Sequence, residues 1–549
     1  MTTAPLIEVQ DLRIDLADGG SHVAAVEGVS FRIDRGETFG LVVESGCGKS
    51  ITALALIGLL RRPLSIAAGA IRFEGREIQG LSAAEQRALR GNRIAMIFQE
   101  PMTALNPVVP VGRQIDEVLR AHTNLDARAR KKRILDMMEQ VRLPQVERIF
   151  ASYPHRLSGG QRQRIMIAMA LVLEPKLLIA DEPTTALDVT TQKQILTLIR
   201  DLQRDHGTAV LFITHDMGVV AEIADRVAVM RQGRLVETGA LDTVLRDPTM
   251  EYTRNLLSAV PSLVPRAARP ETKDPVVLEA NDLSKIYKER AFFGKGREVV
   301  AADKVTLTLR KGRTLGIVGE SGSGKSTVAR CIVRLIDPTS GGVRLSGREI
   351  SDISRRLLQP HRQKIQIVFQ DPYRSLNPRI SVGESIAEGP INYGTSHADA
   401  MKRARELLEL VGLPADAVTR YPHQFSGGQR QRIAIARALA LDPDVLVADE
   451  AVSALDVSVQ AQVLELLDEI QKRLGIAILF ITHDLRVAAQ ICDEVVVMQH
   501  GRVVEQGPAA EVLTHPKEAY TRALLEAAPG RGWDFANFRP VSESVAASA

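Results

Sequence analysis

The sequence predicts an α/β protein built from two tandem modules of the same fold. The chain repeats itself, since Gln161–Arg164 recurs as Gln429–Arg432 and Asp181-Glu182 recurs as Asp449-Glu450, each 268 residues later. Each copy alternates short apolar runs with helical stretches, a pattern typical of parallel strands joined by crossover helices. At 549 residues the chain is also too long for one ordinary core.

Composition changes mark the boundaries between the modules. The segment Pro261–Pro275 has four prolines and no apolar period, which indicates an extended, semi-rigid linker. The end of the chain is rich in Gly, Ser and Ala, which is typical of a poorly ordered segment. We therefore expect a first module over 1–262, a linker over 263–274, a second module over 275–530 and a flexible tail over 531–549.

Local patterns place strands and helices at matching positions of the two copies. Strands are expected where short apolar runs end at Gly or at acidic residues, and helices where apolar residues recur with helical spacing. The expected strands are Thr38–Val43, Leu177–Ala180, Val210–Ile213, Thr314–Val318, Val445–Ala448 and Ile478–Ile481. The expected helices are Ile51–Leu60, Ala127–Val141, Thr327–Ile336 and Ala398–Val411.

Composition excludes several classes of function. The most apolar segment, Ile165–Leu173, is far shorter than the roughly 20 residues that cross a bilayer, so any membrane role has to come through a partner. No basic region followed by an apolar run opens the chain, so we expect no secretory signal. The net charge is +4 and basic residues are scattered among acidic ones, which argues against a nucleic-acid partner.

The three cysteines are isolated from one another. Cys47, Cys331 and Cys492 lack the spacing of a zinc site or a disulfide framework, which fits a reducing compartment. We expect all three to be packing residues, and we expect no iron–sulfur cluster, because none of them is clustered with another.

The second copy contains a full phosphate-binding loop between an expected strand and an expected helix. Gly319–Ser326 reads Gly-Glu-Ser-Gly-Ser-Gly-Lys-Ser, in which glycines let backbone N–H groups curl around phosphate oxygens. Lys325 would contact those oxygens and the Ser326 hydroxyl would ligate Mg²⁺. In the first copy, Lys49 and Ser50 are intact but Val43 replaces the first glycine, so that turn is expected to be strained.

Each copy also has two acidic residues at the end of a buried apolar run. Asp181 and Asp449 are suited to binding Mg²⁺, while Glu182 and Glu450 can polarise an attacking water. An acidic pair found alone is more often a helix cap. The phosphate loop upstream in both copies favours the catalytic interpretation.

The ordered motifs resemble those of the ABC ATPase family. Leu157–Gln161 and Phe425–Gln429 are similar to the family's signature, and they are joined by Gln99, Gln370 and the Ala-Leu-Asp turns at 186–188 and 454–456. His215 and His483 stand where the family has a histidine that contacts the γ-phosphate. Seven motifs occur in the same order in both copies, and the resemblance covers nearly the whole chain.

The resemblance implies modules with a RecA-like α/β core, an antiparallel β subdomain and a helical subdomain. It also implies a head-to-tail pair of modules with ATP and Mg²⁺ at two composite sites. Site one would contain Glu44, Ser45, Gly46, Cys47, Gly48, Lys49, Ser50, Ile51, Gln99, Asp181, Glu182 and His215, closed by Ser426, Gly427, Gly428 and Gln429. Site two would contain Tyr287, Gly319, Glu320, Ser321, Gly322, Ser323, Gly324, Lys325, Ser326, Thr327, Gln370, Asp449, Glu450 and His483, closed by Ser158, Gly159, Gly160 and Gln161. Catalysis would rest on Glu182, Glu450, His215 and His483, and the metal on Ser50, Gln99, Asp181, Ser326, Gln370 and Asp449.

Narrower signals point to the dipeptide, oligopeptide and nickel importers of this family. The segments Gln99–Pro107 and Gln370–Pro378 resemble their glutamine loops, and Glu251–Pro261 and Ala519–Pro529 resemble their module ends. A fused chain is similar to the glutathione- and peptide-type systems and to the mycobacterial dipeptide importer. The resemblance implies an ATPase that drives peptide import at the cytoplasmic face of the cell membrane, with two permease subunits docked on its helical subdomains and a substrate-binding protein.

Two other kinds of ABC protein fit less well. A ribosome-acting protein would have a long charged helical linker and no long insert between glutamine loop and signature, whereas Pro101–Leu157 and Pro372–Phe425 are full length. A DNA-repair ATPase would need zinc modules or long coiled coils. The cargo itself, whether dipeptide, oligopeptide, glutathione or nickel, is not encoded in this chain.

The two sites are expected to differ in affinity for ATP. In relatives an aromatic residue ahead of the phosphate loop stacks on adenine. The second module has Tyr287 there, while the first has Leu16. With Val43 in place of a glycine as well, site one is expected to be the weaker site.

Overall fold

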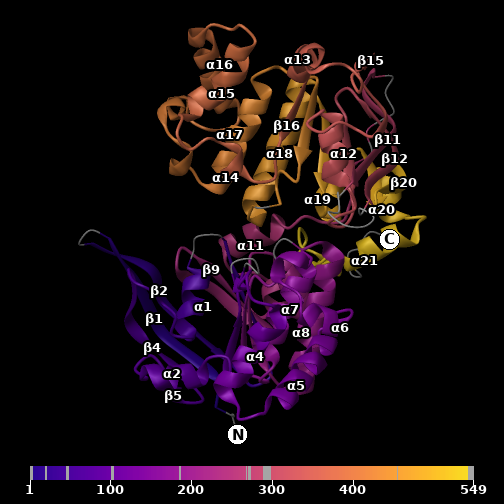
Figure 1. Ribbon diagram of the computed structural model, residues 1–549. Coiled ribbons are helices and arrows are strands. Elements are labelled where there is room, and N and C mark those ends of the chain that lie inside the picture. Colours follow the sequence, from indigo (N-terminus) through magenta and orange to yellow (C-terminus); the bar gives the residue numbers. More distant parts are fainter. Residues whose placement is uncertain are drawn as a thin grey trace. The chain divides into compact units, whose positions relative to one another are not determined.

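The protein is described by a computed structural model that covers residues 4–18, 21–44, 48–99, 104–184, 187–267, 269, 274–288, 298–453 and 455–541 (Figure 1). The chain forms two compact units. Unit 1 comprises Met1–Leu187, Thr191–Val260 and Pro529–Ala549, and unit 2 comprises Asp188–Thr190 and Pro261–Ala528. The segment that follows each module is therefore part of the other unit.

Each unit is built on a six-stranded, mainly parallel sheet. In unit 1 the order is β10-β9-β3-β8-β7-β6, and in unit 2 it is β20-β19-β13-β18-β17-β16, read from the corresponding edge. The last hairpin is antiparallel in both. The unit 1 strands are β3 (Thr38–Val43), β6 (Ile94–Ile97), β7 (Leu177–Asp181), β8 (Ala209–Thr214), β9 (Arg226–Arg231) and β10 (Arg234–Ala240). Those of unit 2 are β13 (Thr314–Val318), β16 (Ile365–Val368), β17 (Val445–Asp449), β18 (Ala477–Thr482), β19 (Glu494–Gln499) and β20 (Arg502–Pro508).

A four-stranded antiparallel sheet accompanies each core. The orders are β2-β1-β4-β5 and β12-β11-β14-β15. The strands are β1 (Ile7–Asp18), β2 (Ser21–Ile33), β4 (Leu64–Phe73), β5 (Arg76–Glu77), β11 (Val276–Lys288), β12 (Glu298–Arg310), β14 (Ser340–Leu345) and β15 (Arg348–Glu349). A short hairpin, β21 (Trp533–Asp534) with β22 (Arg539–Pro540), lies in the segment expected to be a flexible tail. Phe535 in that segment is buried.

Helices connect the strands and form a separate helical layer in each unit. The helices of the first half are α1 (Lys49–Leu56), α2 (Ala83–Leu89), α4 (Val111–His122), α5 (Ala127–Gln140), α6 (Val146–Phe150), α7 (Gly159–Leu171), α8 (Val189–His206), α9 (Met217–Ile223), α10 (Leu241–Arg246) and α11 (Glu251–Ser258), with a 3-10 turn at Pro154–Arg156. Those of the second half are α12 (Lys325–Ile332), α13 (Arg355–Lys364), α14 (Pro372–Ser375), α15 (Val382–Asn392), α16 (His397–Leu410), α17 (Gly427–Leu439), α18 (Val457–Leu474), α19 (Leu485–Ile491), α20 (Ala509–Thr514) and α21 (Ala519–Ala527), with 3-10 turns at Ala415–Thr419 and Pro422–Gln424. The two modules, each with an α/β core, an antiparallel sheet and a helical part, confirm the expected fold class.

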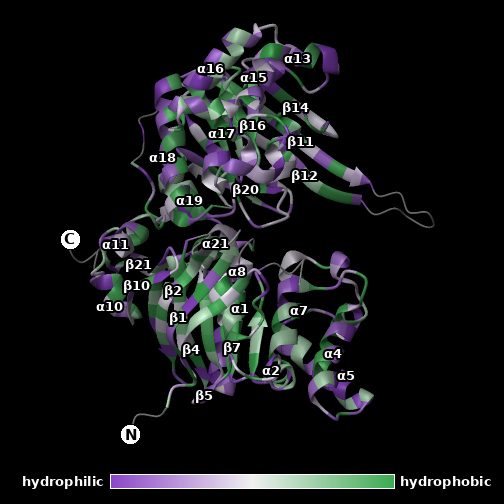
Figure 2. Ribbon diagram, turned by 90° about the vertical axis from the view of Figure 1, so that its left-hand side faces the viewer, coloured by the Kyte–Doolittle hydropathy of each residue, from purple (hydrophilic) through white to green (hydrophobic). Residues whose placement is uncertain are grey.

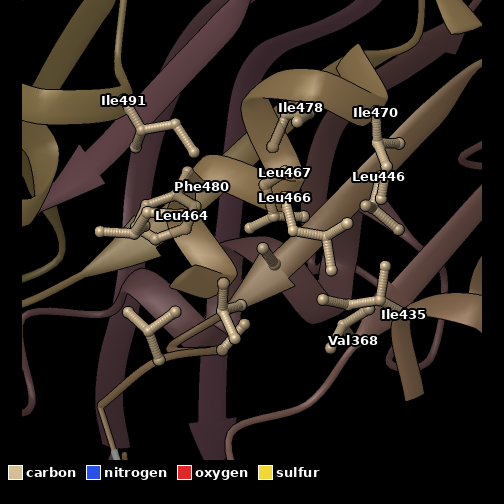
Figure 3. Packing of buried hydrophobic residues seen from close by; sticks show 14 of the residues in the cluster. Val368, Ile435, Leu446, Leu464, Leu466, Leu467, Ile470, Ile478, Phe480 and Ile491 are labelled. Carbon is tan, nitrogen blue, oxygen red and sulfur yellow. The ribbon is translucent and has the colours of Figure 1, made fainter. Parts of the chain in front are cut away.

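The hydropathy pattern explains why the central strands stand where they do. β3, β7 and β8 are buried along their whole length, as are β13, β17 and β18. Figure 2 colours each residue by its hydropathy and labels β7 among these strands. Strands buried on both faces have to be apolar throughout, which is why these runs lack the alternation of a half-exposed strand. In unit 2, side chains of β17, β18 and α18 pack together with those of α17 and α19 (Figure 3).

This core fixes the ends of the central strands, where the polar motifs begin.

Cys331 and Cys492 are buried free thiols, and burial raises the pKa of Cys331 to about 11. Cys47 lies outside the described residues. Among the described residues, no helix is both long and apolar enough to cross a lipid bilayer.

Candidate functional site

In unit 2 the phosphate loop leaves the carboxyl end of β13 and leads into α12. Gly319 has φ 150°, and a Cβ there would lie 2.3 Å from the carbonyl oxygen of Met498. Gly324 caps α12 with φ 103°, and its Cβ would lie 2.1 Å from the carbonyl oxygen of Ala301. Both positions therefore require glycine, because a side chain would meet fixed backbone in a conformation that it adopts only at a cost.

Lys325 is enclosed by this loop. Its Nζ donates hydrogen bonds of 2.8 Å to the carbonyl oxygens of Gly319 and Glu320, and the residue is only 4% exposed. Burial lowers the pKa of Lys325, although nearby carboxylates such as Glu450 oppose the shift. A buried ammonium held by two carbonyls can exchange them for phosphate oxygens, which carry more negative charge.

The other loop residues lie around this lysine. Glu320, Thr327 and Ser326 are partly exposed, and Ser321 and Gly322 are exposed. Among the described residues, the buried hydroxyl of Ser323 has no hydrogen-bond partner. Buried polar atoms are nearly always paired, so an unpaired one beside a glycine-lined loop fits a site that accepts a ligand.

A carboxylate at the end of β17 completes the proposed metal ligands of unit 2. The hydroxyl of Ser326 donates to Oδ1 of Asp449 at 2.8 Å. Burial raises the pKa of Asp449, and the Ser326 hydrogen bond and the charge of Lys325 only partly oppose this. A buried carboxylate of this kind gains from a divalent cation, and Ser326 and Asp449 are oxygen donors suited to Mg²⁺.

Glu450 follows directly and lies at the meeting point of three motifs. Gln370 Nε2 donates to Oε2 of Glu450 at 2.7 Å, and His483 Nδ1 lies 3.6 Å from Oε1. Burial alone raises the pKa of Glu450, but the interaction with His483 and the charge of Lys325 lower it below its usual value. Glu450 is therefore held as a carboxylate, the form that can accept a proton from water.

The backbone turns out of the strand at this glutamate in both units. Glu182 has φ 48° and Glu450 has φ 51°, a left-handed conformation that is unusual for a residue with a long side chain. Their N–H groups still donate to Ile213 and Ile481 in the neighbouring strands, at 2.9 and 3.0 Å. The repetition of the same strained turn at both glutamates is a feature that sequence reasoning did not predict, and such strain gathers at functional sites.

Unit 1 brings the corresponding residues together around Glu182. Lys49 Nζ contacts Oε1 of Glu182 directly, Gln99 Nε2 donates to Oε2 at 2.8 Å, and His215 Nδ1 lies 3.4 Å from Oε1. Burial raises the pKa of Asp181, opposed by a hydrogen bond from Ser50 and by the charge of Lys49. Oδ1 of Asp181 is buried and has no hydrogen-bond partner among the described residues.

The first loop differs from the second where its first glycine is replaced. Val43 is the last residue of β3 and pairs in register with Met230, so the strand runs one residue further than β13. The expected strain at Val43 was wrong, because the residue stays in the strand instead of making the turn. Gly48 caps α1 with φ 91°, followed by Lys49, Ser50 and Ile51 in the helix, while Glu44 is partly exposed. Ser45, Gly46 and Cys47 lie outside the described residues.

The signature segments form the N-termini of α7 and α17. Ser158 and Ser426 are the N-caps, and each forms a capping box with the glutamine three residues on, Gln161 or Gln429. Gly159 and Gly427 start the helices. At the second glycines, a Cβ on Gly160 would lie 2.9 Å from Thr191, and one on Gly428 would lie 2.2 Å from Val459. Both serines are exposed, so their hydroxyls and the helix ends are accessible to an anion.

Of two aromatic residues in unit 2, the sequence assigned a role to only one. Tyr287, on β11, is 41% exposed with Lys285 Nζ 5.4 Å from its ring centre, and Leu16 takes the same register position in β1. Sequence reasoning did not assign a role to Tyr520, whose hydroxyl accepts a hydrogen bond from the Glu320 N–H at 3.2 Å. The signal was the repeated Tyr-Thr-Arg at 252 and 520, which was interpreted only as a module end.

Comparison with known families agrees with this arrangement. The family described as "ABC transporter" matches residues 26–185 and 302–453. The family described as "Oligopeptide/dipeptide transporter, C-terminal region" matches residues 236–293 and 504–540. Both families thus occur twice, in the two halves of the chain.

Curated relatives match over nearly the whole length. A "Peptidoglycan transport ATP-binding protein YejF" of Agrobacterium fabrum is 49% identical over 96% of this chain and 97% of its own. A "Glutathione import ATP-binding protein GsiA" of Escherichia coli is 47% identical over 95% of this chain and 89% of its own. The solved "Dimeric Structure of MJ0796, a Bacterial ABC Transporter Cassette" aligns at 30% identity and a TM-score of 0.39, over 42% of this chain and 98% of that one.

Both families recur in each half of the chain, and the curated relatives match it from end to end. The chain belongs to the ABC transporter family, as a tandem ATPase coupled to transport that carries two oligopeptide/dipeptide transporter C-terminal regions.

Proposed function

We propose that this chain hydrolyses ATP at two composite sites to drive a peptide importer of the dipeptide and oligopeptide class. The observation that carries the proposal is the arrangement around Glu450. A carboxylate kept ionised by its surroundings accepts a hydrogen bond from Gln370, lies beside His483 and follows the carboxylate that Ser326 contacts. These residue types in this arrangement suit phosphoryl transfer to water.

In this proposal each residue has a role set by its position. Lys325 and the loop N–H groups bind phosphate oxygens, and Tyr287 stacks on adenine. Ser326, Gln370 and Asp449 hold Mg²⁺, which supplies charge neutralisation at the phosphates when it is bound. Glu450 accepts the proton of the attacking water and His483 contacts the γ-phosphate. In site one the same roles fall to Lys49, Ser50, Gln99, Asp181, Glu182 and His215.

The signature helices complete the sites. We propose that Ser426–Gln429 closes site one and Ser158–Gln161 closes site two, since a serine hydroxyl and glycine N–H groups at a helix start can cap a phosphate. The pairing of the modules within one chain would then make each site depend on both halves. We also propose a first module over 1–262, a linker over 263–274 and a second module over 275–530.

The peptide class of the cargo rests on the relatives and on the family of the C-terminal regions. Names that refer to peptidoglycan and glutathione both point to compounds that contain peptide bonds. The partners would be two permease subunits and a substrate-binding protein, and the chain would work at the cytoplasmic face of the membrane. The inserts after Gln99 and Gln370, which include α4–α6 and α15–α16, would each receive one permease subunit.

Cross-linking with the co-purified permease tests the importer function. Single cysteines placed at exposed positions of α5 and α16, such as Lys132 and Lys402, should form cross-links to permease loops, one subunit for each insert. The matched control is a cysteine at Asp352, outside the inserts. Cross-links that join the permease elsewhere and leave both inserts free would contradict the proposal.

A further inference from the structure

The segment after each module docks on the other unit, and the two docking surfaces are chemically different. The segment after the first module is Pro261–Arg269, which we call the linker extension, and it belongs to unit 2. The segment after the second module is Pro529–Val541, the terminal extension, and it belongs to unit 1. Each extension contacts the short helix that follows the histidine of the ATP site, α19 in unit 2 and α9 in unit 1.

The linker extension is held by two arginines. The N–H of Arg266 donates to the carbonyl oxygen of Ala489 at 2.8 Å, and its Nη1 donates to that of Ile491 at 2.7 Å. Both acceptors lie in the last turn of α19, where helix carbonyls lack an internal partner. A cation at this end also meets the negative end of the helix dipole.

Asp468 on α18 receives both arginines. Arg266 Nη2 lies 3.2 Å and Arg269 Nη2 lies 3.1 Å from its Oδ1, while Arg269 also donates to Gln471 at 3.0 Å. Burial raises the pKa of Asp468, but a hydrogen bond from Lys472 and the charges of the two arginines outweigh this effect. The pKa of Asp468 is therefore lower than usual. Asp493 also lies 3.9 Å from Arg266 and 3.5 Å from Arg269, but unit 1 has an aspartate at the matching position, Asp225. Asp468 is therefore the carboxylate that distinguishes the two units.

The corresponding residue of unit 1 has the opposite charge. The helices α8 and α18 align without gaps, and this places Arg200 where unit 2 has Asp468. If the linker extension docked on unit 1, Arg266 and Arg269 would face Arg200, and the like charges would repel each other. The linker extension thus fits α18 and is unsuited to α8 of its own module.

The terminal extension docks through a close backbone approach instead of charge. The Gly530 N–H donates to Glu222 Oε1 on α9 at 3.1 Å, and a Cβ on Gly530 would lie 2.7 Å from the Cα of Gly218. Trp533 lies against Arg246, whose guanidinium carbon is 5.7 Å from the ring centre. The contact thus needs glycine at position 530, which approaches the backbone of Gly218 closely.

Unit 2 has no room for such an approach. Arg486 lies on α19 at the position where α9 has Gly218. Its side chain is buried, and its Nη2 donates a hydrogen bond of 2.8 Å to Oδ2 of Asp484. The terminal extension therefore fits α9 and is unsuited to α19 of its own module.

From these two differences we infer that Asp468 and Gly218 specify which extension docks on which unit, so that each module is held by the segment that follows the other. Unit 1 has Arg200 where unit 2 has Asp468, and unit 2 has Arg486 where unit 1 has Gly218. These two differences keep each extension from docking on its own module. The inference does not depend on the cargo or on ATP hydrolysis.

The linker half is tested by hydrogen–deuterium exchange of the full chain, in the peptide that contains Arg266. Asp468→Arg, which introduces the residue of unit 1, should raise exchange there at least tenfold, whereas the exposed control Asp352→Arg should leave it unchanged. Asp468→Asn, which removes the charge but nearly keeps the size of the side chain, should raise exchange several-fold, less than Asp468→Arg does. Unchanged exchange in Asp468→Arg, or wild-type exchange in Asp468→Asn, would overturn the inference.

The terminal half uses Trp533, the single tryptophan of the chain, as its probe. Gly218→Arg, which introduces the residue of unit 2, should at least double the acrylamide quenching constant of its fluorescence. Gly530→Ala should do the same, because Gly530 has φ 73° and no space for a Cβ. Gly532→Ala is the matched control, since nothing lies within 4 Å of its Cβ position. Equal quenching in Gly530→Ala and Gly532→Ala, or wild-type quenching in Gly218→Arg, would refute this half.

Discussion

The two phosphate-loop lysines have different partners, although the motifs around them are nearly the same. Lys325 donates to the carbonyl oxygens of Gly319 and Glu320 within its own loop. Lys49 contacts the carboxylate of Glu182, and both of these side chains are buried. The contact of Lys49 therefore reaches the residue proposed to activate water, and the contacts of Lys325 reach its own loop.

The two loops also differ at the position of the first glycine. Gly319 turns away from β13 with φ 150° and directs its carbonyl to Lys325, whereas Val43 continues β3. To bind a phosphate, Lys49 would have to leave a buried carboxylate, and breaking a buried ion pair is costly. We therefore expect this one position to influence the affinity of each site for ATP.

The largest effect is expected when the two carboxylates proposed to activate water are removed, which tests whether both sites support the same chemistry. Glu182→Gln with Glu450→Gln should reduce ATPase activity with permease present at least ~100-fold, since a positioned base contributes 10²–10⁴-fold. Glu450→Gln alone should abolish most of the turnover and retain ATP at site two. Wild-type-like turnover in the double variant would contradict the roles given to both glutamates.

Exchanging the glycine and the valine sharpens the comparison. Gly319→Val should weaken ATP binding at site two about tenfold or more, because strained backbone costs ~1–3 kcal/mol and ~1.4 kcal/mol is a factor of ten. Val43→Gly should leave site two unaffected and strengthen site one. Fluorescent nucleotide titration measures both, and if Gly319→Val bound ATP as tightly as the wild type, the explanation of the comparison would fail.

A smaller effect on ATP affinity is expected at Tyr287, the residue proposed to stack on adenine. Tyr287→Leu, which introduces the residue of site one, should weaken ATP binding at site two a few-fold, because leucine recovers part of the ~1–3 kcal/mol that an aromatic ring provides to a base. Leu16→Tyr is the reciprocal variant and should strengthen site one. No change in either titration would show that the exposed ring of Tyr287 does not stack on the base.

The smallest effect concerns stability and its pH dependence. Burial raises the pKa of Asp449, so the folded state without metal carries an unfavourable charge at neutral pH. Asp449→Asn should therefore stabilise the nucleotide-free protein by about 1 kcal/mol, as substitutions at functional sites often do. The gain should shrink as the pH falls through the raised pKa, where wild-type Asp449 becomes neutral.

Thermal unfolding from pH 8 to pH 4, with Asp352→Asn as the exposed control, measures this difference. A stabilisation that did not depend on pH would mean that the charge of Asp449 is not its cause.

Much of the fold was predictable because the central strands are short, wholly apolar and end at polar motifs. The expected strand Thr38–Val43 is confirmed to the residue as β3. The expected helix Ile51–Leu60 was less accurate, since α1 starts at Lys49 and ends at Leu56. Its end is set by Gly58 in a left-handed conformation, a local turn that apolar spacing does not reveal.

The motif residues were predictable because their order along the chain is so specific, but their pairing was not. The contact between Lys49 and Glu182 joins residues that lie far apart in the sequence, so no local pattern reveals it. The left-handed turns at Glu182 and Glu450 and the crossing of the two extensions result from tertiary packing, which has no local pattern in the sequence.

The central claim, that the two ATP sites are unequal because of their loops, is tested most directly by titrating nucleotide onto Lys49→Ala and Lys325→Ala. The first variant leaves site two intact and the second leaves site one. We predict a Kd about ten- to a hundredfold higher for Lys325→Ala, which corresponds to about 1.4–2.8 kcal/mol. Equal affinities of the two surviving sites would contradict the account and would mean that neither Gly319 nor Tyr287 confers an advantage.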